Sequence, residues 1–235
     1  MLSAALLGLA AFAMALSLAV TPLVIGLCRR HSALDQPDAR KIHKAGTPRL
    51  GGVSVFVALS LGLSAAAVAG NLGWFDLPVA QARLLPVIYF GLCGFFLIGF
   101  LDDLRSIPVL PRLAGQLAVA AAVVLLSGGA IGIRALFGQY VLPEWLSVAV
   151  TVLWIAGVVN TFNWIDGLDG LAAGIAAISA SAFLVLALTE HGLPNSLLTA
   201  AICTVLIGAV LGFLPYNFHP ARIFIGDGGA FSLGY

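Results

Sequence analysis

Long apolar runs alternate with short polar segments along the whole chain. About 20 consecutive apolar residues are enough for a helix to cross the hydrocarbon core of a bilayer. An eighth run begins near Gly229, and the seven complete runs cover residues 3–27, 51–70, 84–101, 113–127, 145–162, 171–189 and 196–214. The pattern predicts an all-α fold: a polytopic transmembrane helical bundle with about seven complete spans plus the start of an eighth. We expect a single integral membrane domain over residues 1–235.

The segments that connect the runs differ in charge. Alternation of the spans places four of them on one side, at about residues 28–50, 102–112, 163–170 and 215–228. The segments on the other side carry two cations, Arg83 and Arg134. The four segments on this side carry nine: Arg29, Arg30, Arg40, Lys41, Lys44, Arg49, Arg105, Arg112 and Arg222. Segments rich in Lys and Arg stay in the cytoplasm. We therefore predict a multi-pass membrane protein with an outside N-terminus and these four segments in the cytoplasm.

Composition narrows the classes of partner. Hydrophobic residues make up 61% of the chain and charged residues 9%, whereas soluble domains carry about 25% charged residues. The net charge of +1 gives no bulk attraction to nucleic acid, so that partner is disfavoured. The cysteines match no zinc-site spacing and are interpreted as buried small hydrophobic residues. The N-terminal run is too long for a secretory signal and follows no cation, so we expect an uncleaved span.

The most informative polar stretch lies between the fifth and sixth runs. Four polar side chains follow one another there at intervals of three residues: Asn160, Asn163, Asp166 and Asp169. Polar groups are costly beside lipid, so a metal or a polar substrate is the expected reason for them. On a continuous helix, neighbouring members would share a face and the four would fan across about half of it. The alternative is a polar helix end with two Asp-Gly turns.

Two other segments bring carboxylates to the same side. Asp102 and Asp103 are adjacent, and adjacent carboxylates repel each other unless a cation or a shared proton intervenes. Magnesium takes carboxylate oxygens while keeping waters or phosphate oxygens. Asp227 lies among glycines that would let bare amides approach a metal-bound phosphate. Asn217 and Phe224 could give a base a hydrogen bond and a stacking face. A solvated helix end and a tight interhelical turn are the simpler alternatives.

The first of the four segments is basic. Arg40, Lys41, Lys44 and Arg49 stand there together with His43. This pattern suits capture of phosphate groups by Arg forks and Lys point charges. Contact with anionic lipid headgroups is the alternative. Together, the carboxylates and cations on one membrane face indicate a divalent metal and a phosphorylated substrate from the cytoplasm, with the second reactant coming from the bilayer.

These residues resemble those of a known family, the polyprenyl-phosphate N-acetylhexosamine-1-phosphate transferases. The resemblance runs from about Asp35 to the end of the chain. It rests on the Asp102-Asp103 pair, the Asn160 to Leu171 block and the segment from Asn217 to Gly229. The basic loop is more similar to the branch that starts O-antigen, enterobacterial common antigen or teichoic acid linkage than to the muramyl-pentapeptide translocase branch.

The resemblance implies a reaction and a cofactor. A sugar 1-phosphate, most simply N-acetylglucosamine 1-phosphate, would pass from a UDP-N-acetylhexosamine to undecaprenyl phosphate in the membrane lipid, releasing UMP. This would be the first membrane step of cell-envelope polysaccharide synthesis, on the cytoplasmic face of the bacterial inner (plasma) membrane. Mg2+ is the implied cofactor, with Mn2+ as the alternative, and a homodimer is left open.

The resemblance also implies a role for each matching residue. Asp102 and Asp103 would be the catalytic pair, and Asp227 and Asp166 would hold the metal. The substrate-binding residues would be Lys44, Arg49, Asn160, Asn163, Asp166, Asp169, Asn217 and Phe224.

Two departures from the family pattern are visible. Ser106 stands where many members carry a third acid, and the chain stops at Tyr235 inside an expected span. The family continues with more spans and a histidine-bearing loop, so we expect the chain to be truncated at its C-terminus. Three alternatives remain: the muramyl-pentapeptide transferase, a lipid-binding scaffold and a cation-coupled transporter. The transporter predicts ionisable residues near midspan and an inverted repeat, and neither is evident in the sequence.

Overall fold

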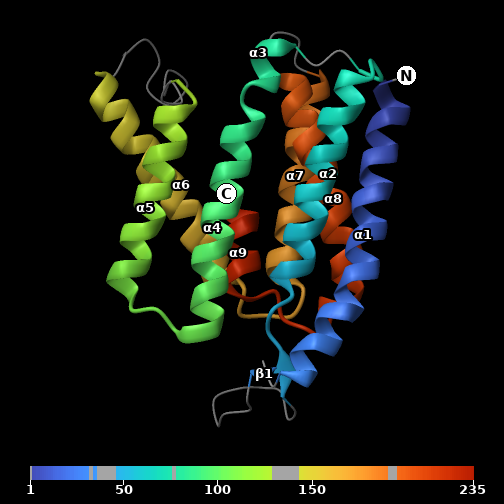
Figure 1. The fold of residues 1–235 in the computed structure, drawn as a ribbon, viewed down its shortest axis with the longest axis vertical. Helices are drawn as coiled ribbons and strands as arrows, with labels where there is room; N and C mark the ends of the chain where they lie inside the picture. The colour runs from blue at the N-terminus through green and yellow to red at the C-terminus, as the bar shows by residue number, and fades with distance from the viewer. Residues whose placement is uncertain (1, 32–33, 36–45, 76–77, 129–142, 190–194) are drawn as a thin grey trace.

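The computed structural model describes residues 2–31, 34–35, 46–75, 78–128, 143–189 and 195–235. Within these residues it contains seven helices long and apolar enough to cross a membrane (Figure 1). They are α1 (Leu2–Arg30), α2 (Gly52–Asn71), α4 (Leu85–Arg105), α5 (Val109–Leu126), α6 (Glu144–Ile165), α7 (Leu171–Thr189) and α8 (Ser196–Asn217). The predicted all-α bundle of seven spans is confirmed.

Four short elements complete the described fold. Helix α3 (Val79–Ala82) precedes α4, and α9 (Gly226–Gly234) follows α8. Strands β1 (Leu34–Asp35) and β2 (Thr47–Pro48) pair antiparallel beyond the end of α1. Figure 1 shows β1, the α4–α5 turn, the α6–α7 connection and the start of α9 together at the lower end of the bundle. The described parts of the four segments predicted to share one side therefore do so.

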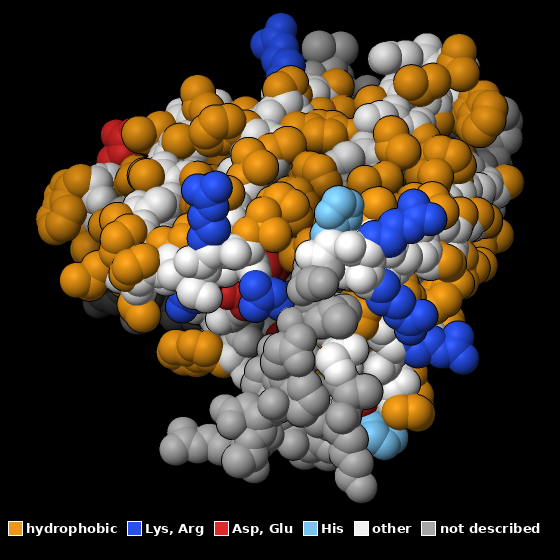
Figure 2. Space-filling view, turned by 60° about the horizontal axis from the view of Figure 1, so that its bottom comes forward, with side chains coloured by type: hydrophobic (Ala, Val, Ile, Leu, Met, Phe, Trp, Pro, Cys, Tyr) orange, Lys and Arg blue, Asp and Glu red, His pale blue; other side chains and the backbone are white. Residues whose placement is uncertain are grey.

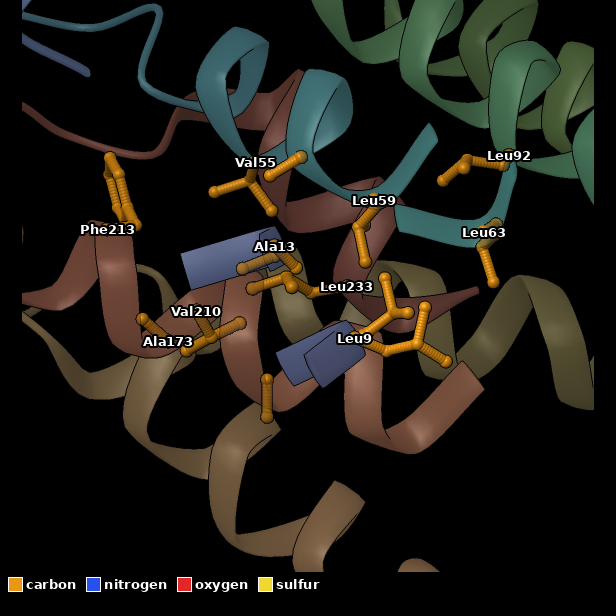
Figure 3. Packing of buried hydrophobic residues seen from close by; sticks show 14 of the residues in the cluster. Leu9, Ala13, Val55, Leu59, Leu63, Leu92, Ala173, Val210, Phe213 and Leu233 are labelled. Carbon is orange, nitrogen blue, oxygen red and sulfur yellow. The ribbon is translucent and has the colours of Figure 1, made fainter. Parts of the chain in front are cut away.

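The largest apolar core joins α1, α2, α7 and α8. Figure 3 shows Leu9 of α1, Leu59 of α2 and Val210 of α8 in this cluster, which also takes in Leu233 of α9. Helices α1 and α8 approach closely because Gly208 and Gly212 face the backbone of α1, at Ala10 and Met14. A Cβ at either glycine would collide with a carbonyl oxygen of α1. Small residues of this kind commonly allow close helix packing in membranes, and they do so here.

Helix α9 lies between α1, α2, α7 and α8 on one side of the bundle and α4, α5 and α6 on the other. It packs against α4, α6 and α2 (Figure 1). Its first turn passes so close to α2 and α4 that glycine is required there: Gly52 faces the backbone of Gly229, and Gly99 faces the backbone of Asp227. A side chain at either position would push the start of α9 away. Two spans thus fix, through backbone contacts, where Asp227 lies.

Several predicted boundaries are wrong by a few residues. The segment 102–112 is largely helical, because α4 continues through Arg105 and α5 already begins at Val109 rather than at 113. Ser106 ends α4 in the left-handed conformation, with φ of 46°, and Pro108 fixes the backbone that leads into α5. Helix α9 begins at Gly226 rather than Gly229.

The prediction that four polar residues share one continuous helix is also wrong. Asn160 and Asn163 lie on α6, but that helix ends at Ile165, and α7 begins at Leu171. Asp166 and Asp169 therefore belong to the turn between the helices. Gly170 explains the break in part, because its φ of +73° lies in the region that only glycine adopts freely. The Asp-Gly turn reading is the one that the backbone supports.

Candidate functional site

Asp227 stands at the centre of a polar cluster at the lower end of the bundle. Its Oδ1 accepts a hydrogen bond of 2.6 Å from Nδ2 of Asn163, and its Oδ2 lies 3.5 Å from Nη1 of Arg112. Figure 2 shows acidic side chains in the middle of this end, basic side chains beside them and hydrophobic side chains over the flanks. Helices α5, α6 and α9 therefore meet at one carboxylate.

Asp103 connects α4 to the start of α9. Its two carboxylate oxygens accept hydrogen bonds of 3.0 Å from the backbone N–H groups of Asp227 and Gly228. The first N–H groups of a helix have no partner within the helix and favour a negative charge. Asp103 satisfies two of them, so in this structure its carboxylate anchors the residue that carries Asp227.

Asp102 faces Arg112 across the short α4–α5 turn. Its Oδ2 forms an ion pair with Nη1 of Arg112, and its Oδ1 accepts a hydrogen bond from the backbone N–H of Ile107. Arg112 thereby bridges Asp102 and Asp227. Sequence reasoning counted Arg112 only as one of the loop cations. The available signal was its position in the first turn of α5, where the helix dipole disfavours a cation unless carboxylates compensate it.

Asp166 follows directly after α6 and faces the same cluster. Burial raises the pKa of its carboxyl from 3.8 to about 8, and the charges of Asp227 and Asp103 contribute to that rise. A hydrogen bond with the backbone of Gly226 opposes it. The carboxyls of Asp166 and Asp227 therefore disfavour each other's charged form, and the nearby cation Arg112 is already shared with Asp102.

This donor set suits a hard divalent cation. Among the described residues, no three His, Cys, Asp or Glu side chains are grouped closely enough to form a metal site by themselves. Mg2+ does not need such a cage, because it commonly binds one or two carboxylates and takes its other oxygens from water and substrate phosphates. The uncompensated carboxylates of Asp166 and Asp227 fit that pattern.

The backbone of residues 48–52 runs beside the start of α9. Phe224 N–H donates to the carbonyl of Pro48 at 2.8 Å, and Gly51 N–H donates to the carbonyl of Phe224 at 2.9 Å. Arg49 lies within this pairing, and its charge acts on Asp103. The structure thus brings Arg49 and Phe224 to the cluster. Lys44 lies outside the described residues.

Asp169 and Asn217 hold the connection between α8 and α9. Oδ2 of Asp169 lies 2.9 Å from Nδ1 of His219 and accepts a hydrogen bond of 3.1 Å from Ala221 N–H. Nδ2 of Asn217 donates to the carbonyl of Ile223 at 3.0 Å. Both side chains therefore hold the backbone that leads from α8 to α9, the helix that carries Asp227. His219 was not among the predicted site residues.

Asn160 lies one turn deeper along α6 than Asn163. Its Nδ2 donates to Oε1 of Gln116 on α5 at 2.7 Å and to the carbonyl of Ala156 at 2.8 Å. Its polar contacts are thus with α5 and with its own helix, rather than with the cluster around Asp227. Gln116 was also missed, although it is the polar residue that interrupts the fourth apolar run.

Comparison with known proteins decides the family. The model of glycosyl transferase family 4 matches residues 85–235, which include the cluster from Asp102 to Asp227. The chain belongs to this family. With its seven apolar helices, this glycosyl transferase family 4 member is an integral membrane protein.

Relatives with more specific names extend the similarity. The chain is 35% identical over 224 residues, 93% of its length, to a probable undecaprenyl-phosphate N-acetylglucosaminyl 1-phosphate transferase of Bacillus subtilis, and covers 57% of that protein. It is 34% identical over 218 residues, 88% of its length, to the decaprenyl-phosphate N-acetylglucosaminephosphotransferase of Mycolicibacterium smegmatis, and covers 52% of it. The phospho-N-acetylmuramoyl-pentapeptide-transferase of Bacillus mycoides is 32% identical over 255 aligned residues, with 100% of this chain and 74% of that protein covered. The chain thus spans little more than half the length of the first two relatives.

Proposed function

We propose that the protein transfers a sugar 1-phosphate, most simply N-acetylglucosamine 1-phosphate, from a UDP-sugar to undecaprenyl phosphate and releases UMP. The observation that carries the proposal is the carboxylate of Asp227, held between Asn163 and Arg112 at one membrane end of a glycosyl transferase family 4 bundle. The name of the Bacillus subtilis relative supports the choice of donor and acceptor. The product would enter cell-envelope polysaccharide synthesis.

The cluster is proposed to lie on the cytoplasmic face of the inner membrane. Nine of the eleven Lys and Arg residues fall in the four sequence segments predicted to share one side, and such segments stay in the cytoplasm. A UDP-sugar is made in the cytoplasm, whereas a polyprenyl phosphate lies in the bilayer. An acidic cluster at the rim of a helical bundle is accessible from both.

Asp227 and Asp166 are the proposed holders of Mg2+, with Mn2+ able to replace it. The bound cation would neutralise charge on the diphosphate and polarise a phosphoryl oxygen. Asn163 and Arg112 orient Asp227 from two sides, and the bonds from Asp103 fix the backbone that carries it. Asp166 and Asp227 would regain their charged forms when the cation binds, since each then faces a positive neighbour.

The phosphate of undecaprenyl phosphate, which would attack the UDP-sugar, needs little help to lose its proton. A phosphate monoester has a second pKa of about 6 and is largely dianionic at neutral pH. Asp102 is already paired with Arg112, and an ion-paired carboxylate is a weak base. We therefore assign Asp102 to holding Arg112, rather than to proton abstraction. Catalysis then rests on alignment of the two phosphates and on charge neutralisation.

The uridine part of the donor is assigned to the segment that connects α8 to α9. Phe224 would stack on the base. Asn217 and Asp169 would keep this segment in place through their hydrogen bonds to its backbone. Arg49 would meet the diphosphate, and Lys44 is proposed for the same role from the sequence alone.

The test uses membranes that contain the intact protein. They are supplied with undecaprenyl phosphate, Mg2+ and radiolabelled UDP-N-acetylglucosamine, and labelled lipid is extracted. We expect product with the wild type and none above background with Asp227→Ala at equal expression. Glu144→Gln, in the first turn of α6 at the opposite end, is the matched control and should keep full turnover. Full turnover by Asp227→Ala would refute the site.

A second donor is favoured by one specific observation. The Bacillus mycoides phospho-N-acetylmuramoyl-pentapeptide-transferase aligns with the whole chain at 32% identity. Parallel assays with UDP-N-acetylglucosamine and UDP-N-acetylmuramoyl-pentapeptide separate the two activities. We expect transfer from the first donor, and transfer from the second alone would reverse the assignment.

A further inference from the structure

Two amide side chains meet inside the bundle, between α5 and α6. Gln116 is fully buried, with 0% of its surface exposed, and its Oε1 accepts a hydrogen bond of 2.7 Å from Nδ2 of Asn160. Buried polar groups within membrane spans are costly and are usually functional. Nothing in the reaction proposed above uses either amide directly, so the pair calls for a different role.

The orientation of both amides is determined by the surrounding bonds. Nδ2 of Asn160 also donates to the carbonyl of Ala156, one turn back on its own helix. Both of its N–H groups are therefore occupied, and Gln116 must present its carbonyl oxygen to Asn160. Nε2 of Gln116 is buried and has no hydrogen-bond partner among the described residues. Asn160 thus points toward α5 with no N–H left for a substrate, although the sequence suggested a substrate-binding role.

The amide pair lies in register with the residues that hold Asp227. Gln116 is four residues after Arg112 on α5, and Asn160 is three residues before Asn163 on α6. Residues three or four apart lie on the same face of a helix. The α5–α6 interface therefore has an outer level, where Arg112 and Asn163 reach Asp227, and an inner level, where the two amides bond to each other.

The remaining α5–α6 contacts give little directional information. The buried residues of α5 are Gln116, Ala120 and Val124. The neighbouring apolar cluster takes Ala120 from α5 and Val159 from α6, together with Phe95 of α4 and Phe231 of α9. Small apolar surfaces tolerate sliding and rotation, whereas a hydrogen bond fixes both. Among the described side chains, the hydrogen bond between Asn160 and Gln116 is thus the directional contact between α5 and α6.

We propose that Gln116 and Asn160 form a positioning clamp that holds Arg112 and Asn163 on the two oxygens of Asp227. Hydrogen bonds between transmembrane helices add little to stability. Loss of this one should therefore misplace the carboxylate without unfolding the bundle. The proposal rests on the proposed function in one respect, that Asp227 holds the divalent cation.

The experiment measures metal binding and turnover separately. The intact protein is purified in detergent and titrated with Mn2+ alone, followed by electron paramagnetic resonance. Variants are Gln116→Met, which nearly conserves volume, Asn160→Leu, and the double variant. We expect each single change to weaken Mn2+ binding by about tenfold, the lower end for residues that orient a metal ligand. The turnover number should fall, and KM for the UDP-sugar should stay constant.

The double variant distinguishes positioning from packing. It replaces both polar partners, so it leaves no new unsatisfied group from the broken bond. We expect its thermal stability to match the wild type while Mn2+ binding stays as weak as in the single variants. Thr151→Val is the matched control, because Thr151 is buried on α6 and bonds only along its own helix, to the carbonyl of Ser147.

Failure of the clamp and failure of the proposed function give different results. Wild-type Mn2+ affinity in either single variant would overturn the clamp, and so would recovery of that affinity in the double variant. If the wild type transfers no sugar phosphate but both variants still weaken Mn2+ binding, the proposed function fails and the clamp stands.

Discussion

The two sides of the bundle are built differently. Helix α8 packs against α1, α2 and α7, and 61% of its most apolar 18-residue stretch is buried inside the protein. In α5 and in α6, 17% of the corresponding stretch is buried. The first side is held by a large apolar cluster and by glycine contacts between α1 and α8. The second side supplies Asp102, Arg112 and Asn163 to the polar cluster. Stability and chemistry are therefore carried mainly by different helices, with α9 between them.

Among the residues that orient Asp227, the largest effect on turnover is expected from Arg112→Met. This change leaves Asp102 without its ion pair and Asp227 without one of its two orienting groups. We expect turnover to fall about 100-fold, equivalent to about 2.7 kcal/mol of transition-state stabilisation. The measurement is labelled lipid formed at saturating UDP-sugar. Arg105→Met, at the exposed end of α4, is the control, and an equal loss there would attribute the effect to surface charge alone.

The stability of the side formed by α1, α2, α7 and α8 should fall when a single methyl group is added between α1 and α8. Gly208→Ala places a Cβ against the Ala10 carbonyl of α1, so the two helices must separate. Overpacking of this kind costs about 1–3 kcal/mol. We expect a lower thermal midpoint in detergent with unchanged turnover per folded molecule.

Gly157→Ala is the matched substitution on the loosely packed side, because no atom lies within 4 Å of the position that its Cβ would occupy. It should leave the thermal midpoint unchanged. Equal destabilisation by the two alanines would contradict the division of labour between the sides.

A pH dependence of stability is expected at Asp166. A carboxyl whose pKa is raised on folding, here from 3.8 to about 8, binds its proton more tightly in the folded state. Its contribution to stability is therefore unfavourable above pH 8 and disappears as pH falls toward 4. In EDTA at about pH 9, Asp166→Asn should melt a few degrees higher than the wild type, and at about pH 4 the two should converge. A higher melting temperature for the wild type under the alkaline condition would contradict this sign.

The fold was largely predictable because lipid imposes a simple pattern. Apolar runs and the distribution of Lys and Arg gave the seven spans and the shared end of the polar segments. The gathering of Asp102, Asp103, Asp166 and Asp227 followed from that shared end.

The details of the site depended on backbone geometry that the sequence expresses weakly. The ion pair between Asp102 and Arg112 needs the left-handed turn at Ser106, a conformation that serine adopts rarely. The capping of α9 by Asp103 needs contact between residues that are 124 positions apart in the chain. Spacing along α6 suggested that Asn160 and Asp166 act alike, yet the helix ends between them. Local backbone geometry at Ser106 and Gly170 decided the first and the third, and a tertiary contact decided the second.

The start of α9 touches α2 and α4 through main-chain atoms at Gly52 and Gly99. Main-chain atoms have no alternative rotamers, so no flexible side chain can absorb a movement at these two contacts. Any change in the tilt of either span, for instance from bilayer thickness, is passed on to the acid at the head of α9. A change in membrane thickness that tilts α2 or α4 is thus expected to move Asp227.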